Sequence, residues 1–100
     1  MSHARVVLDR YVVGTLMRDL VAHDHSPSAF LVYLYLWVAA SERRGRPIAV
    51  SLQTIAFEVG LSKSAVQASM RLLSRRRLVQ VSRASRTAIP EYTVLRPWVR

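Results

Sequence analysis

The chain of 100 residues contains no cysteine, which excludes disulfide bridges, cysteine-ligated zinc and thiol nucleophiles. It has only three glycines and four prolines, and 51% of its residues are hydrophobic, so chain-long disorder is not expected. Its longest apolar run, residues 29–40, is shorter than the ~20 residues that span a bilayer. The first residues also lack the layout of a signal peptide. We therefore expect one small folded domain, without a membrane span, in the cytoplasm.

Acidic residues are scarce as well: six Asp and Glu stand against fifteen Lys and Arg, for a net charge of +9. Residues 1–50 hold six basic and four acidic residues, a balance of +2, whereas residues 51–100 hold nine and two, a balance of +7. Fourteen of the basic residues are arginine, which forms paired hydrogen bonds with phosphate groups and guanine edges. One strongly basic half indicates a polyanionic partner, and a merely solubilising surface is the alternative.

Two helices are predicted in the first half of the chain. Apolar residues at three- and four-residue steps predict a helix over 9–23. Ser26 followed by Pro27 predicts the start of the second helix, and Gly45 its end. This second helix is apolar nearly all round, so either other helices cover it fully or one side forms a dimer contact. Its aromatic residues are expected in the core rather than stacked on bases: Phe30, Tyr33, Tyr35 and Trp37.

Two shorter helices are predicted in the second half. Ser51 and Ser62 are good N-cap residues, and they predict helices over 52–59 and 62–76. Gly60 lies between the two helices and is suited to a turn, because glycine adopts a positive φ without a steric penalty.

Strand patterns surround these two helices. A short β-prone run at 47–50 precedes them. Alternating residues at 78–83 and 91–95 follow them, joined by a polar connector at 84–90 that contains an arginine. Two alternating runs with such a connector predict a β-hairpin.

Residues 52–71 resemble the helix-turn-helix motif. Ala56 stands where that family has a small residue facing the second helix, and Gly60 follows four positions later at the turn. Ser69 stands where the family usually has an apolar residue. The other apolar positions of the family are filled: Ile55, Val59, Leu61 and Val66.

With the hairpin included, the chain resembles winged helix-turn-helix transcription regulators, and also the winged-helix domains of plasmid and phage replication initiators. The resemblance implies an α+β, mainly α fold with a three-helix core and a β-hairpin wing. Residues 1–25 would form an N-terminal helical extension and residues 26–100 the winged helix-turn-helix domain, within one compact domain overall. The implied function is sequence-specific binding of double-stranded DNA by a small, nucleoid-associated transcriptional regulator.

The residues of the 62–76 helix are expected to form two faces. Val66, Met70 and Leu73 lie at steps of four and three and form an inward stripe. The opposite face has no acidic residue, unlike an ordinary solvent-exposed helix face, and small residues at its start would let it sit deep in the major groove. The predicted base-reading residues are Lys63, Ser64, Gln67, Ala68 and Arg71.

Contacts with the DNA backbone are predicted around this helix, because helix N-termini and arginines bind phosphate groups. The predicted backbone residues are Ser51, Gln53, Thr54, Ser62, Arg75 and Arg76. Arg83 and Arg86 are expected to act from the wing, with Arg86 near its tip entering the minor groove.

No residue pattern indicates catalysis, a metal site or a cofactor. His23 and His25 lie two positions apart and do not share a helix face, so with Asp24 they are read as a polar loop. No serine has the context of a catalytic triad, and no glycine-rich phosphate loop is present. We expect a protein that is not an enzyme and has no small-molecule substrate.

A homodimer on double-stranded DNA is expected, because one winged helix contributes only ~600–1,000 Å² of contact and paired half-sites add specificity. Three alternatives remain open. The chain could be the DNA-binding domain of a plasmid or phage replication or partition protein, with the same contact chemistry. It could be a winged helix used for protein–protein interaction, or it could bind structured RNA.

Overall fold

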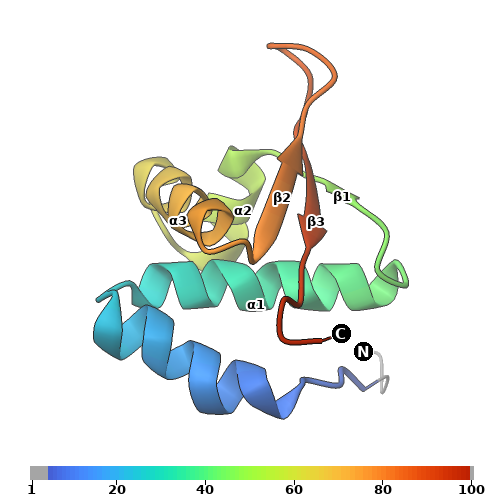
Figure 1. The fold of residues 1–100 in the computed structure, drawn as a ribbon. Coiled ribbons are helices and arrows are strands. Elements are labelled where there is room, and N and C mark those ends of the chain that lie inside the picture. Colours follow the sequence, from blue (N-terminus) through green and yellow to red (C-terminus); the bar gives the residue numbers. More distant parts are fainter. Residues whose placement is uncertain (1–4, 100) are drawn as a thin grey trace.

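The computed structural model describes residues 5–99. Residues 1–4 of the predicted N-terminal extension (1–25) and residue 100 of the predicted winged helix-turn-helix domain (26–100) lie outside the described residues. The fold is α+β and mainly helical, with one small antiparallel sheet (Figure 1). Its elements are η1 (Val12–Leu16), η2 (Arg18–His23), α1 (Pro27–Glu42), β1 (Ile48–Ala49), α2 (Leu52–Val59), α3 (Lys63–Arg75), β2 (Val79–Ser82) and β3 (Glu91–Val94).

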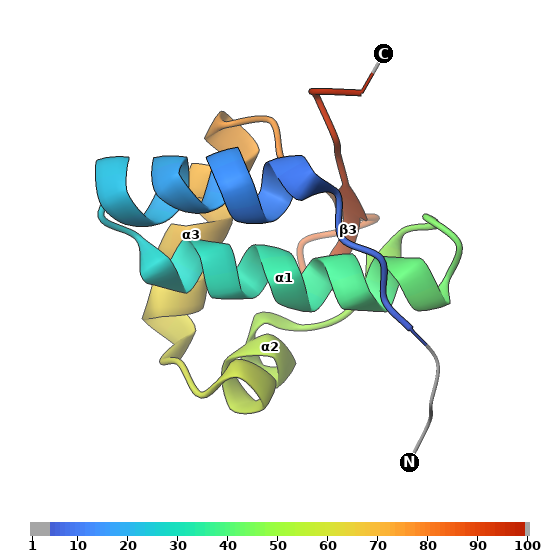
Figure 2. The same ribbon diagram turned by 90° about the horizontal axis from the view of Figure 1, so that it is seen from below.

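Helix α1 crosses the middle of the molecule. The N-terminal helix (residues 10–23, which include η1 and η2) lies along one side of α1, and α2, α3 and the sheet lie on the other (Figures 1 and 2). Within the described residues, no helix combines the length and the apolar character needed to cross a membrane.

The helix predicted over 9–23 is present, but most of it has π-type hydrogen bonds. The N–H of Asp24, for example, donates to the carbonyl of Asp19 at 2.9 Å. Val12, Leu16 and Leu20 recur at every fourth residue and form the buried stripe. A four-residue step suits both the ~3.6-residue turn of an α-helix and the wider turn of a π-helix, so the sequence pattern does not distinguish them. Residues 5–9 before this helix have no regular secondary structure.

Helix α1 begins as predicted. The Oγ of Ser26 accepts a hydrogen bond from the N–H of Ala29 at 3.2 Å, and Pro27 occupies the first turn. After the helix, Gly45 adopts a φ of +81° and its N–H donates to the carbonyl of Ala40. These contacts satisfy backbone groups that a helix end would otherwise leave without partners.

The sheet has the strand order β1-β3-β2, and both pairings are antiparallel. Tyr92 of the central strand lies opposite Ile48 on one side and Val81 on the other. The predicted hairpin is therefore confirmed, and β1 adds a third strand to it. The connecting loop, residues 83–90, extends away from the helices (Figure 1).

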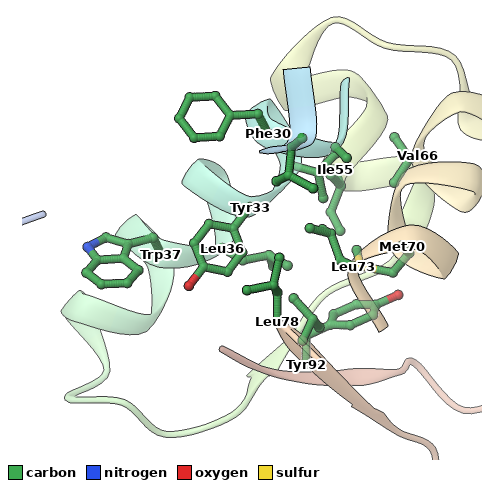
Figure 3. Close-up of a cluster of buried hydrophobic side chains, with 14 of the residues drawn as sticks. Phe30, Tyr33, Leu36, Trp37, Ile55, Val66, Met70, Leu73, Leu78 and Tyr92 are labelled. Carbon is green, nitrogen blue, oxygen red and sulfur yellow. The ribbon is translucent and has the colours of Figure 1, made fainter. Parts of the chain in front are cut away.

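One hydrophobic core joins all of these elements (Figure 3). Leu16 and Leu20 of the N-terminal helix belong to the same core as α1, so the predicted extension packs onto the rest of the chain. The hydroxyl of Tyr33 donates to the carbonyl of Leu95 at 3.0 Å, and this bond ties α1 to the segment after β3. Figure 3 labels Phe30, Tyr33, Leu36, Trp37, Ile55, Val66, Met70, Leu73, Leu78 and Tyr92.

The two ends of the described chain are also held together. The ring of Trp98 stacks on that of Tyr11 with centroids 4.5 Å apart, and its Nε1–H donates to the carboxylate of Asp9 at 3.0 Å. Arg96 adds an ion pair to the same carboxylate at 3.3 Å. The N-terminal helix is thus anchored at its start by residues close to the C-terminus.

Candidate nucleic-acid interface

Helices α2 and α3 are capped as the sequence predicts. The Oγ of Ser51 accepts the N–H of Thr54 at 3.1 Å, and the Oγ of Ser62 accepts the N–H of Ala65 at 3.1 Å. Gly60 ends α2 with a φ of +74°, a conformation that favours glycine. The two helices are therefore joined by a short turn with defined geometry.

Helix α3 has one buried and one exposed face, as its spacing predicts. Val66, Met70 and Leu73 are buried against α1, α2 and the sheet (Figure 3). All five residues predicted to read bases lie on the exposed face: Lys63, Ser64, Gln67, Ala68 and Arg71. No acidic residue occurs anywhere in α3, so this face presents positive charge and hydrogen-bonding groups to solvent.

Ser69, which stands where the resemblance leads us to expect an apolar residue, points into the protein. Ser69 is only 2% exposed, and its Oγ makes no hydrogen bond within the described part of the chain. Met70 beside it is buried too. Helix α3 thus directs both Ser69 and Met70 into the core.

A hollow of about 220 Å³ brings together three groups of predicted residues that are distant in the sequence. Ser51 and Gln53 contribute from the start of α2, Lys63 from the start of α3, and Arg83 from the hairpin. The remaining lining residues are Leu52, Thr87, Ala88, Ile89 and Pro90. No acidic residue lines the hollow, so two cationic residues and the start of α2 border a space without negative charge.

Thr87, Ala88 and Ile89 of the hairpin loop were not predicted as site residues, although they line the hollow. The only signal in the sequence that these three residues belong to the site is their position next to Arg86, which is predicted to act from the wing. Within the loop, the guanidinium of Arg83 donates a hydrogen bond to the carbonyl of Arg86 at 3.4 Å. Both arginines are exposed.

The three arginines after the exposed face of α3 occupy different environments. Arg75 is exposed in the last turn of α3. Arg76, predicted to contact the DNA backbone, instead has its guanidinium on the carboxylate of Asp24. Arg77 has a φ of +58°, and it is exposed just beyond the helix.

Asp24 is the common acceptor of a small polar cluster. Its Oδ1 lies 3.0 Å from the Nδ1 of His23, and Arg76 binds both of its oxygens. The hydrogen bond from Arg76 lowers the pKa of the Asp24 carboxyl, and the hydrogen bond from His23 lowers this pKa by a smaller amount. Across residues 5–99, no group of three or more His, Asp or Glu side chains is placed to hold a metal ion.

Comparison with known proteins identifies no relative: the chain matches no protein-family model, no curated protein and no solved structure.

Proposed function

We propose that the chain is a winged helix-turn-helix protein that binds double-stranded DNA sequence-specifically, as a small transcriptional regulator. The observation that carries the proposal is the exposed, acid-free face of α3, which lies beside the acid-free hollow between α2, α3 and the hairpin loop. The proposed activity is binding, with no catalytic step.

In this proposal α3 is the recognition helix and lies in the major groove. That groove is wide enough for an α-helix, and each base pair there presents a distinct pattern of donors and acceptors. Gln67 can pair with adenine, and Arg71 and Lys63 with guanine. Ala68 can contact a thymine methyl group, and Ser64 can pair with either kind of base edge.

Backbone phosphates would be held around α3. The first turns of α2 and α3 contain backbone N–H groups that have no partner within their own helix, and Gln53 is exposed at the second position of α2. A phosphate in the hollow would also meet Lys63 and Arg83. The remaining proposed backbone contacts are Ser51, Thr54, Ser62 and Arg75.

The β2–β3 hairpin is proposed as the wing. Its loop extends away from the helices, and its two exposed arginines would contact the backbone or the minor groove (Figure 1). We leave Arg76 out of the proposed contacts, because moving it onto DNA would break the two hydrogen bonds that it donates to Asp24. A second copy of the chain is proposed as the protein partner.

The proposal is tested by selecting bound sites from a random duplex pool and then titrating salt against the enriched site. Binding through several phosphates predicts that log K falls with log[salt] with a slope of about −0.9 per phosphate contact. Enrichment of no sequence, together with a shallow salt dependence, would contradict it. Competition with unlabelled duplex DNA and duplex RNA of matched length separates DNA binding from RNA binding. Only the DNA competitor should displace the labelled DNA from the protein.

A further inference from the structure

An apolar groove runs between α1 and α2. It has a volume of about 470 Å³ and is lined by Leu31, Leu34, Tyr35, Val38, Ala39, Glu42, Glu58 and Val59. Leu31 and Val38 lie two turns apart on one face of α1 and are 45% and 39% exposed. Helix α1 is apolar nearly all round, and this is the side that its neighbours leave open. Exposed apolar surface of this kind is typical of an interface.

The groove is also acidic, on a protein that is otherwise basic. Glu42 at the end of α1 and Glu58 near the end of α2 are both exposed. Neither forms an ion pair among the residues that the structure describes. The chain as a whole carries a net charge of +9. The groove therefore suits an occupant that brings apolar side chains together with positive charge, and it does not suit DNA.

The N-terminal helix of the same chain has such a surface. Val13 and Met17 lie four residues apart and are 46% and 40% exposed, beside the buried stripe that faces α1. Arg10 and Arg18 are exposed next to them and form no ion pair within residues 5–99. We call the surface formed by Arg10, Val13, Met17 and Arg18 the N-terminal strip.

The N-terminal helix and α2 lie on either side of α1 when the molecule is seen from below (Figure 2). In Figure 1 the N-terminal helix lies below α1, and the hairpin loop extends upward on the other side of α1. A two-fold axis makes every contact between two copies occur twice. If the strip of copy one packs into the groove of copy two, the strip of copy two also packs into the groove of copy one. Such a contact leaves the exposed face of α3 free.

We propose that the chain forms a symmetric homodimer in which the N-terminal strip of each copy packs into the α1–α2 groove of the other. Val13 and Met17 cover Leu31 and Val38, and the arginines of the strip lie beside Glu42 and Glu58. The proposed dimer rests on the proposed function, because the role of the dimer is to bind DNA. The dimer interface uses none of the residues proposed to contact DNA.

The test exchanges the charges of the two surfaces. One variant carries Glu42→Arg and Glu58→Arg, and a second carries Arg10→Glu and Arg18→Glu. Each variant alone presents like charges on both surfaces, so we expect its dimer dissociation constant to rise at least about tenfold. In an equimolar mixture, every groove meets a strip of opposite charge, and we expect a heterodimer to form. Rescue in the mixture also shows that both variants are folded.

Sedimentation velocity at concentrations up to ~100 µM measures all of these species. A control with Arg44→Glu and Arg46→Glu, on the exposed loop after α1, changes the net charge by −4, as the Arg10→Glu and Arg18→Glu variant does, and should leave the dimer intact. The proposal is overturned if the unaltered chain sediments as one chain throughout, if either variant dimerises like the unaltered chain, or if the mixture stays monomeric. Binding of labelled duplex DNA is measured in parallel, so loss of the dimer and loss of DNA binding are seen separately.

Discussion

Arg76 and Asp24 form a two-point ion pair between the end of α3 and the turn that precedes α1. The Nε of Arg76 donates to Oδ2 of Asp24 at 2.9 Å, and its Nη2 donates to Oδ1. The two residues are 52 positions apart in the sequence. Their side chains are 13% exposed for Asp24 and 35% for Arg76, so the pair is partly shielded from solvent. It fixes the end of α3 relative to the N-terminal helix.

Asp24→Asn keeps the size of the side chain and removes its charge, so we expect the free energy of unfolding to fall by ~1 kcal/mol at neutral pH, and by less at high salt. Because the folded state lowers the pKa of Asp24, this stabilisation is present above the ordinary carboxyl pKa. It is lost as the pH falls through the lowered value. Urea unfolding should therefore show a larger difference between the two proteins at pH 7 than at about pH 2.

Glu91→Gln is the control for this change. Glu91 is exposed and forms no ion pair within the described residues. Its substitution should leave the free energy of unfolding within about 0.5 kcal/mol at both pH values. An equal loss in both variants would show that the effect comes from net charge and not from the contact with Arg76.

Ser69→Ala should raise the free energy of unfolding by ~1 kcal/mol, because a buried hydroxyl without a hydrogen-bond partner is destabilising. Chemical denaturation measures the change. Ser74→Ala, at an exposed position of the same helix, corrects for the better helix propensity of alanine. A destabilised Ser69→Ala variant would mean that the hydroxyl contributes more than its burial suggests.

Arg77→Gly should also stabilise the protein, by ~1 kcal/mol, because glycine adopts the left-handed conformation of this position without strain. The backbone geometry supports this expectation: the N–H of Leu78 donates to the carbonyl of Leu73 at 2.9 Å, as in a helix end that favours glycine. Arg77→Ala removes the same side chain but keeps the strain, so it should bring no gain. Thermal unfolding of the two variants, measured side by side, distinguishes backbone strain from loss of charge.

Arg71→Ala and Gln67→Ala should each weaken binding to the preferred DNA site by ~1–3 kcal/mol and relax the preference between sites. Both side chains lie on the exposed face of α3 and have no structural partner in the hydrogen bonds of the described chain, so the fold should be unaffected. Binding of selected and scrambled duplexes by fluorescence anisotropy measures both quantities. Unchanged site preference in the Arg71 variant would show that α3 is oriented differently on DNA.

Arg86→Ala should weaken binding to all duplexes by a similar factor. It should also reduce the magnitude of the slope of log K against log[salt] by about 0.9, the contribution of one phosphate contact. Arg86 lies in the hairpin loop, away from the base-reading face, and its side chain is exposed. The same anisotropy assay at several salt concentrations provides the measurement. A selective loss on one sequence only would indicate that the loop takes part in base recognition.

Local signals predicted much of the fold. Ser26, Ser51 and Ser62 were expected to cap helices, and each accepts the backbone N–H three residues later. Gly60 was expected in the turn and has the required positive φ. These features depend on residues close together in the sequence, so their physical causes are visible in the sequence itself.

The candidate site was predicted less completely. The exposure of the α3 face follows from helical spacing, and the structure confirms it. The pairing of Arg76 with Asp24 could not be predicted, because no pattern in the sequence shows that residues so far apart will meet. The same holds for Ile89, which lines the hollow only because the end of the hairpin loop lies near the starts of α2 and α3.

The sequence by itself determined which segments form helices and strands, which face of α3 is polar, and that the second half of the chain is strongly basic. These are properties of neighbouring residues and of a fixed helical or strand period. Only the tertiary structure decided which cations stay free and which side of α1 stays open. Both outcomes depend on which distant segments pack together, since burial and ion pairing are set by spatial neighbours and not by neighbours in the chain.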